Sequence, residues 1–476
     1  MSNSAVMTYP LIIGGEKVLK KDVCPILNKY SDEEYAYISV AGADDVKKAV
    51  DAAKQAFENT YFDIQTRYTV LTKAAQLMIE REDDLAQVLI QETGKTVQDA
   101  HNEVKWSVDL LTESAEEAKR INGETFCLPV PWLDTRTCYT RREPIGIVAA
   151  ITPFNFPLNL VVHKVAPALA AGNPVILKPA EATSVIGYKF CEILLDAGVP
   201  MGFLSCLTGS GRVIGRELTK NPDINFYSFT GSVPVGKSIK EQIGLRKCAL
   251  ELGSNAATIV CEDYNVDAAV ASCADAAFTN AGQVCIHLQR IFVERTIYDI
   301  FLEKLVKVSE QKVVGNPADP DTEIGPIIAA KEAVRIMEWV DEAKASGAVV
   351  HCGHKRENSL VWPTVLTNTT NDMKVMCDEV FGPVVCVVPF DTMQEAYTML
   401  NDSRYGLNAG ILTNNMPVAM EAIAKLKTGS VIVGGTCGFR FGCMPYGGVK
   451  ESGFGKEGPK YAIEEMTEMK AVVILS

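Results

Sequence analysis

Cys285 is the residue of this sequence best placed to act as a nucleophile. It lies in the Gly-interrupted polar segment from Thr279 to His287, between a helix-like run that ends at Phe278 and a strand-like run that begins at Arg290. A thiolate at such a junction can meet a ligand and attack an electrophilic carbon. The competing interpretation is packing, because the chain has 14 cysteines and free cysteine is usually buried.

Two residues far from Cys285 in the sequence could complete this chemistry. Glu251 stands between Leu250 and Leu252, and a lone acid among apolar residues has a raised pKa that suits a general base near neutrality. Asn155 lies in a turn between prolines, where its amide could donate to an oxyanion. A paired structural acid and a turn-forming asparagine are the competing interpretations.

Two other loops could bind a nucleotide. Lys178 and Glu181 follow an apolar strand and could bond ribose hydroxyls or phosphate, although a solvated charge pair explains them equally well. Gly231 and Ser232 lie in a loop before a helix-like run, and a helix start offers free N–H groups to a pyrophosphate. This loop lacks the G-x-G-x-x-G pattern and is weak support on its own.

The elements that must position these residues alternate along the chain. Long amphipathic helices are expected between residues 43 and 121, and strands alternate with helices from residue 146 onward, which is typical of a parallel α/β sheet. Ligands of such sheets bind beyond the carboxyl ends of the strands. Between residues 124 and 142 the pattern alternates polar and apolar residues, which predicts a projecting strand pair that must find another surface.

Composition excludes several classes of partner. A formal charge of −13 argues against nucleic acid and anionic membranes, which require a basic field. No apolar run reaches transmembrane length, and the first ten residues lack the features of a signal peptide. The cysteines include no C-x-x-C pair, so no metal site is predicted, and reduced thiols in the cytoplasm are expected.

Seven motifs occur together and in a fixed order. They are T-P-F-N-F-P around Asn155, K-P-A-E from Lys178, F-T-G-S from Phe229, L-E-L-G around Glu251, G-Q-x-C at Cys285, E-V-F-G-P from Glu379 and P-Y-G-G before Lys450. Together they resemble the NAD(P)-dependent aldehyde dehydrogenase superfamily, from about Leu11 to the C-terminus.

The resemblance implies an α/β aldehyde dehydrogenase fold in three parts. These are a Rossmann-like NAD-binding domain (residues 1–121 and 145–250), an α/β catalytic domain (251–459) and a β oligomerisation arm (122–144 and 460–476). A homodimer or homotetramer is expected.

The resemblance also implies a mechanism. Cys285 attacks the aldehyde, the Asn155 amide and the Cys285 backbone N–H hold the oxyanion, and after hydride transfer Glu251 activates the water that hydrolyses the thioester. Lys178 and Glu181 are expected at the adenosine ribose, with Glu181 favouring NAD over NADP. The other coenzyme contacts implied are Thr152, Pro153, Phe154, Gly231, Ser232, Leu252, Glu379 and Phe381.

Substrate choice depends on departures from the family pattern. His163 stands where succinate-semialdehyde enzymes usually carry Arg, and His287 and Arg440 are further candidates for a polar, partly cationic pocket. For His287 a core position, and for Arg440 a pairing with a carboxylate that holds its loop, remain open alternatives. The roles of Cys437 and Cys443 stay open.

The reading that results is an NAD-dependent dehydrogenase for a small polar or anionic aldehyde of the lactaldehyde, glycolaldehyde, sulfolactaldehyde or semialdehyde type. The alternatives are an NADP-using succinate-semialdehyde-type enzyme and a non-catalytic binding protein on the same fold. The presence of both Cys285 and Glu251 argues against the binding protein.

Overall fold

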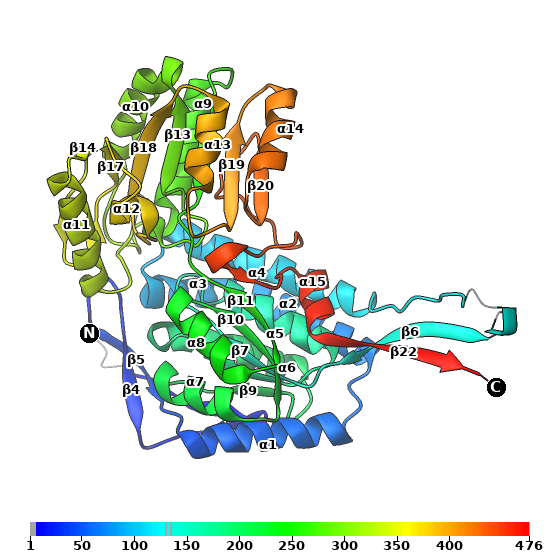
Figure 1. The fold of residues 1–476 in the computed structure, drawn as a ribbon. Coiled ribbons are helices and arrows are strands. Elements are labelled where there is room, and N and C mark those ends of the chain that lie inside the picture. Colours follow the sequence, from blue (N-terminus) through cyan, green and yellow to red (C-terminus); the bar gives the residue numbers. More distant parts are fainter. Residues whose placement is uncertain (1–5, 129–130, 134–135, 476) are drawn as a thin grey trace.

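A computed structural model describes residues 6–128, 131–133 and 136–475 of the chain. Two large sheets, one above the other in Figure 1, form the body of the molecule, and a two-stranded ribbon projects from it. No helix in these described ranges is long and apolar enough to cross a membrane.

The first sheet has eight strands in the order β21-β11-β10-β7-β8-β9-β2-β3. From β11 to β9 neighbouring strands are parallel, whereas β21 and β2 join antiparallel. Its strands are β2 (Leu11–Ile13), β3 (Glu16–Val18), β7 (Ile147–Ile151), β8 (Val175–Lys178), β9 (Leu204–Cys206), β10 (Ile224–Thr230), β11 (Lys247–Glu251) and β21 (Gly453–Phe454).

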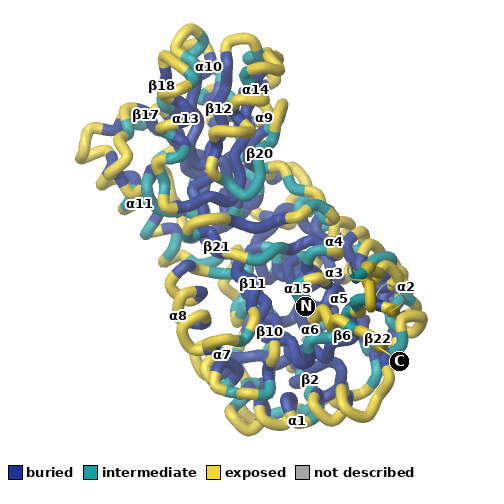
Figure 2. Tube along the Cα trace, turned by 45° about the vertical axis from the view of Figure 1, so that its right-hand side comes forward, coloured by how far each residue is buried: buried dark blue, intermediate teal, exposed yellow. Residues whose placement is uncertain are grey.

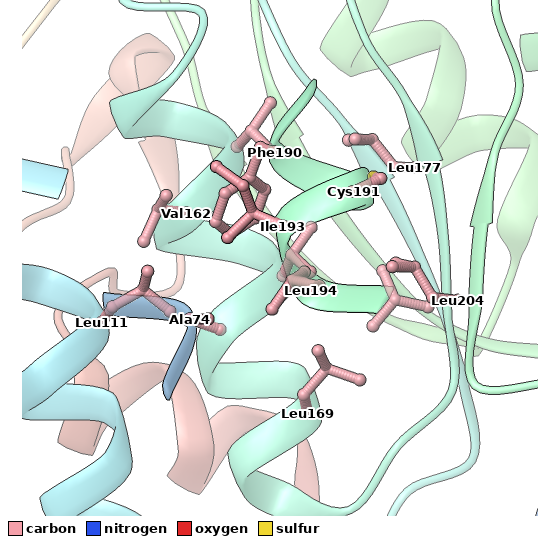
Figure 3. Close-up of a cluster of buried hydrophobic side chains, with 14 of the residues drawn as sticks. Ala74, Leu111, Val162, Leu169, Leu177, Phe190, Cys191, Ile193, Leu194 and Leu204 are labelled. Carbon is pink, nitrogen blue, oxygen red and sulfur yellow. The ribbon is translucent and has the colours of Figure 1, made fainter. Parts of the chain in front are cut away.

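Helices cover both faces of this sheet, as the alternation of side chains along a strand requires. On one face Val148 and Ala150 of β7 pack with the first group of helices, and on the other Ile147 and Ala149 pack with the second. The first group is α2 (Ile64–Glu80), α3 (Glu82–Thr93), α4 (Val97–Ala118), α5 (Asn159–Ala171) and α6 (Ser184–Ala197), and the second is α1 (Ala43–Asn59), α7 (Gly211–Lys220) and α8 (Val233–Ile243). Figure 3 shows the first core, where Leu111 and Val162 face Phe190 and Leu194.

The order of strands creates a crevice in the first sheet. From β7 the chain runs through β8 to β9 on one side, and β10 and β11 then add on the other side of β7. The loops after β7 and β10 therefore diverge at their carboxyl ends, where open α/β sheets bind ligands.

The second large sheet has seven strands in the order β14-β17-β18-β13-β12-β19-β20, all parallel except β14. Its strands are β12 (Ala257–Val260), β13 (Arg290–Glu294), β14 (Val349–Cys352), β17 (Thr364–Thr367), β18 (Val384–Phe390), β19 (Asn408–Leu412) and β20 (Ser430–Val433). Its helices are α9 (Val266–Phe278), α10 (Arg295–Glu310), α11 (Ala330–Ala345), α12 (Lys374–Cys377), α13 (Met393–Asn401) and α14 (Met416–Lys425). The strands are buried and the outer helix surfaces are exposed (Figure 2).

Smaller elements complete the fold. They are the sheet of β1 (Thr8–Tyr9), β5 (Glu34–Ser39) and β4 (Val23–Leu27), the pair β15 (Arg356–Glu357) and β16 (Leu360–Val361), helix α15 (Pro459–Glu465), and the 3-10 turns Pro131–Leu133, Glu181–Thr183, Thr279–Gly282 and Lys450–Ser452.

The projecting ribbon differs from the strand pair predicted between residues 124 and 142. Strand β6 (Thr137–Pro144) pairs antiparallel with β22 (Thr467–Ile474), so its partner comes from the end of the chain. On the upstream side only an isolated bridge joins Thr125 to Tyr139, and Pro131–Leu133 form a 3-10 turn. Residues 129, 130, 134 and 135 of the predicted pair lie outside the described residues. The Leu-Pro-Val-Pro stretch lacks the N–H groups that a ladder needs.

The chain crosses between the two sheets twice, once from β11 to β12 and once from β20 to β21. The chain leaves the first sheet at Glu251 and returns to it as β21, where Gly453 lies opposite Glu251. The Leu252 N–H donates to the Ser452 carbonyl at 3.0 Å, and the Ser452 hydroxyl donates to the Gly253 carbonyl at 2.8 Å. The outgoing and returning segments are thus hydrogen-bonded to each other.

Candidate active site

Cys285 follows a backbone segment in an unusual conformation. Asn280, Ala281 and Gly282 have φ angles of 51°, 55° and 72°, three successive left-handed residues of which only one is glycine. Glycine is required at 282, because a Cβ there would come within 2.2 Å of the Gly382 carbonyl oxygen. Such strain is kept only where the surroundings enforce it, and it aims Cys285 at the space between the sheets.

Asn155 lies beside the Cys285 loop. Its Nδ2 donates to the Gln283 carbonyl at 3.0 Å, which leaves the second N–H of the amide for another acceptor. Helix α4 anchors the turn that carries Asn155. There Glu103 Oε1 accepts hydrogen bonds from the N–H groups of Leu158 and Asn159 at 2.9 and 3.0 Å. The structure thus brings Asn155 next to the loop that carries Cys285.

Glu251, at the end of β11, is a buried carboxylate, and neither of its oxygens has a hydrogen-bond partner in the described part of the chain. Gly447 lies against it, since a Cβ at that position would come within 2.8 Å of Oε1. Burial, and then the charge of Glu457, raise the pKa of Glu251 well above its usual value. A carboxyl group in this state can accept a proton near neutrality.

A buried cluster of charges lies beside Glu251. Glu457 accepts from Lys164 Nζ at 2.6 Å and from Arg440 Nη2 at 2.9 Å, and Lys164 also donates to the Thr230 hydroxyl at 2.7 Å. Burial alone would raise the pKa of Glu457, but the charges of Lys164 and Arg440 lower it below its usual range. Glu457 is therefore a fixed anion between cations.

Arg440 and His163 are in contact, as two residues predicted for one pocket should be. Arg440 Nη2 lies 2.9 Å from His163 Nε2, and burial followed by the Arg440 charge lowers the pKa of His163 well below its usual value. A neutral His163 accepts this hydrogen bond. The guanidinium also lies over the ring of Tyr446, 3.7 Å from its centroid, and the hydroxyl of that tyrosine lies 2.9 Å from Cys285 Sγ.

His287 lies on the other side of the Cys285 loop. Its side chain is buried against α9, where the Ala277 carbonyl is its hydrogen-bond partner, and burial lowers its pKa to about 4. Its Nε2 has no partner in the described ranges. No contact joins it to Arg440 or His163 there, so the predicted substrate residues form one pair and one separate residue.

Comparison with known proteins identifies the family of this chain. Residues 18–472 match the model of the Aldehyde dehydrogenase family. The chain belongs to that family. The 3-sulfolactaldehyde dehydrogenase of Priestia aryabhattai is 48% identical over 99% of both chains. Two solved structures match this aldehyde dehydrogenase over almost their whole length at lower sequence identity.

The first of these structures is aldehyde dehydrogenase 21 of Physcomitrella patens in complex with the reaction product succinate. It has a TM-score of 0.96 and 34% identity, and the match covers 99% of this chain and 98% of that one. The second is the glyceraldehyde-3-phosphate dehydrogenase GapN of Methanocaldococcus jannaschii complexed with NADP, with a TM-score of 0.92, 35% identity and coverage of 96% and 100%. The predicted fold class is confirmed, and the protein is an NAD(P)-dependent aldehyde dehydrogenase.

The crevice of this aldehyde dehydrogenase has the groups that a dinucleotide needs. Lys178 Nζ is nearly buried and forms no ion pair within the described ranges, and burial lowers its pKa to about 8 although Glu181 opposes the shift. A Cβ at Gly211 would come within 3.4 Å of that amine. Glu181 itself is exposed, and Ser232 precedes α8, whose first turn offers the N–H groups of Val233 and Val235 to an anion, while Pro234 between them has none.

The remaining predicted coenzyme residues follow strands at the carboxyl edge of the first sheet, or come from the segment around Glu379 and Phe381. Thr152 has a buried hydroxyl without a partner in the described chain, and Phe154 meets Phe381 edge to face at 5.8 Å between ring centroids. Glu379 accepts from the Ser254 N–H at 3.0 Å, and burial raises its pKa to about 7. Pro153, Leu252, Gly231 and Ser232 follow the ends of β7, β11 and β10 at the carboxyl edge of the sheet. These residues fit the NAD(P) that the family uses.

Sequence reasoning missed three residues of the dehydrogenase site. Lys164 and Glu457 were not among the predicted site residues, and Tyr446 was noted only as part of the P-Y-G-G motif. The available signal was Lys164 itself, a charged residue within the apolar run of α5. Cys437 is buried with its thiol 3.6 Å from the Ile286 carbonyl, and Cys443 is exposed.

Proposed function

We propose that this aldehyde dehydrogenase oxidises a small polar or anionic aldehyde to its carboxylic acid, with sulfolactaldehyde or lactaldehyde as the nearest chemical type and NAD as the favoured coenzyme. The observation that carries the proposal is Arg440, a cation that touches the same tyrosine ring as the nucleophile candidate. The name of the 48% identical Priestia relative points to the same substrate class.

Arg440 retains hydrogen-bond capacity for a ligand. Its Nη2 is used by Glu457 and His163, whereas its Nη1 has no hydrogen-bond partner in the described chain and the side chain is 17% exposed. A guanidinium held in this way is already desolvated and oriented, so a sulfonate or carboxylate on the substrate meets a fixed donor. His163 contributes by keeping Arg440 in place.

We propose a catalytic role for each of three residues, and the geometry of the site supports these roles. Cys285 attacks the aldehyde carbon, and the carbonyl oxygen takes the charge, held by the free Asn155 N–H and the Cys285 backbone N–H. When bound, the coenzyme accepts the hydride. Glu251, buried without a partner and facing Gly447, then takes the proton of the water that hydrolyses the Cys285 thioester.

The coenzyme preference rests on Lys178 and Glu181. Lys178 offers an uncommitted ammonium to ribose hydroxyls, and a carboxylate at Glu181 beside the ribose repels a 2′-phosphate. Glu379 and Phe381 position the nicotinamide end, and Thr152, Phe154 and Leu252 line the path between. The alternative is an NADP-using succinate-semialdehyde-type enzyme, supported by the succinate complex and the NADP complex among the similar structures.

We propose a homodimer or homotetramer that assembles through the ribbon of β6 and β22. Val473, Ile474 and Leu475 are exposed apolar residues at its tip, which a partner subunit would cover. In this proposal the first sheet belongs to the NAD-binding domain, the second sheet to the catalytic domain and the ribbon to the oligomerisation arm. All 14 cysteines are free thiols, which supports a reducing compartment such as the cytoplasm.

The test is a comparison of kcat/KM for propanal, lactaldehyde, succinate semialdehyde and sulfolactaldehyde, each with saturating NAD and then NADP. We expect about a hundredfold preference for an anionic substrate, roughly 2.7 kcal/mol of transition-state binding. Arg440→Gln should remove most of that preference while changing the value for propanal much less. An equal loss for charged and neutral aldehydes would assign Arg440 to the scaffold.

Cys285→Ala is the control for the chemistry. The variant should lose oxidation of every aldehyde in the panel and keep NAD binding, which can be measured by fluorescence quenching. Substantial residual turnover would reject Cys285 as the nucleophile. The non-catalytic alternative would gain support only if the wild-type protein were inactive with the whole panel.

A further inference from the structure

Tyr446 contacts the nucleophile candidate through its hydroxyl group. The phenol oxygen lies 2.9 Å from Cys285 Sγ, and the tyrosine is 1% exposed. Its ring packs with Ile286 and Leu407, and Val284 and Cys285 lie against the same small cluster. The hydroxyl is thus the polar end of a buried side chain whose ring contacts this apolar cluster and the Arg440 guanidinium.

The position of Tyr446 is fixed by the charge cluster. Its backbone N–H donates to the Glu457 carbonyl at 3.1 Å, and the Glu457 N–H donates to the Tyr446 carbonyl at 2.7 Å. The carboxylate of the same Glu457 holds Arg440, whose Cζ lies 3.7 Å from the centroid of the tyrosine ring. One glutamate therefore positions both the ring and the cation that stacks on it.

We propose that Tyr446 is a catalytic residue that stabilises the Cys285 thiolate by donating a hydrogen bond to it, and that Arg440, stacked on the ring, strengthens this donor. The inference rests on the proposed role of Cys285 as nucleophile. The thiol proton leaves to solvent, and Tyr446 keeps its own proton. The hydrogen bond favours the charged sulfur because a thiolate can only accept, whereas a thiol can also donate.

The electrostatics of the site make such a donor necessary. Burial raises the pKa of Cys285 to about 11, and the carboxylates of Glu379 and Glu251 add to the rise. The Tyr446 hydrogen bond and the Arg440 charge act in the opposite direction. Burial and the charge of Cys285 raise the pKa of Tyr446 well above its usual value, so its hydroxyl stays protonated over the pH range of any assay.

The experiment measures the thiol directly and uses Tyr446→Phe, which removes one oxygen and keeps the ring under Arg440. Alkylation of Cys285 by iodoacetamide is followed as a function of pH by mass spectrometry of its peptide. We expect the midpoint of the profile to move upward by about one pH unit. At pH 7 the rate should fall about threefold, because a tenfold smaller thiolate fraction is partly offset by the greater nucleophilicity of a more basic thiolate.

Tyr397→Phe is the matched control. Its ring is equally buried, but its hydroxyl lies 3.5 Å from the Val418 carbonyl in the helical layer of the second sheet. This variant should keep the wild-type alkylation profile. Arg440→Gln should shift the midpoint in the same direction as Tyr446→Phe, and it carries the test if Tyr446→Phe does not fold.

The outcome separates this inference from the proposed function. The acidic limb of the pH profile of kcat/KM for propanal should move together with the alkylation midpoint, because both report the free-enzyme thiolate. An unchanged midpoint in Tyr446→Phe, or a shifted midpoint without a shifted limb, would overturn the catalytic role of Tyr446. Residual turnover in Cys285→Ala would instead reject the nucleophile itself.

Discussion

The charged side chains at the proposed substrate end of the site differ in burial and pairing from those at the proposed coenzyme end. At the proposed substrate end, Lys164 and the partly buried Arg440 both form ion pairs with the buried Glu457. At the coenzyme end, Lys178 has no ion-pair partner in the described chain and Glu181 is exposed. The first arrangement provides a permanent field for the reacting atoms, whereas the second keeps its charges available for a ligand that must enter and leave.

Removing the base at the buried end should have the largest effect. We expect Glu251→Gln to lower steady-state turnover by about 10²–10⁴-fold, because a glutamine cannot take the proton of the hydrolytic water. The first turnover should still produce a burst of NADH, followed by a stall at the thioester, which stopped-flow absorbance at 340 nm would detect. A steady-state rate equal to that of the wild type would contradict the base role.

The second prediction separates a buried carboxylate from an exposed one. Glu457→Gln leaves Lys164 and Arg440 without their counter-charge and should lower the free energy of unfolding by about 3–5 kcal/mol. Glu451 also meets two cations, Lys237 and Arg404, but all three are substantially exposed, and Glu451→Gln should cost less than about 1 kcal/mol.

The measurement for this pair is the urea midpoint of each variant under identical conditions. The midpoint of Glu457→Gln should fall well below that of the wild type, while that of Glu451→Gln stays close to it. Equal shifts in the two variants would mean that burial does not distinguish the two carboxylates, and the comparison of the two ends would fail.

The smallest effect is expected at the coenzyme end. Burial lowers the pKa of Lys178 to about 8, so its positive charge is present below that pH and lost above it. The NAD dissociation constant of the wild type should therefore rise between pH 7 and pH 9. Lys178→Met should weaken binding at pH 7 by about tenfold, as for one charge-assisted hydrogen bond, and flatten the profile. The dissociation constants can be measured by isothermal titration calorimetry at each pH. A Lys178→Met profile as steep as that of the wild type would assign the pH dependence to another group.

The sequence indicated the coenzyme end better than the substrate end, and the reason is topological. Asn155, Lys178 and Gly231 each lie at or after the end of a predicted parallel strand, and such strands end at one edge of a sheet. Their proximity could be predicted without any side-chain direction. The helices between residues 43 and 121 were also predicted closely, since their apolar positions recur at helical spacing.

The substrate end depends on pairings that no local pattern contains. Lys164 and Glu457 are 293 residues apart, and Tyr446 and Cys285 are 161 apart. His287 illustrates the limit, because only the direction of its side chain decides between a pocket and a core position. The partner of β6 was predicted wrongly for a similar reason, since β22 lies more than 300 residues further along the chain.

The double crossing at Glu251 has a consequence for motion. A single strand between two bodies can act as a swivel, whereas two crossings bonded side by side resist torsion and permit mainly a small flexing about their shared line. Glu251 lies on that line, where atoms move least when one sheet flexes relative to the other. The distance from Glu251 to the reacting carbon should therefore vary less than the distances to residues far from this line. The two sheets can then move apart for nucleotide exchange while Glu251 keeps its place.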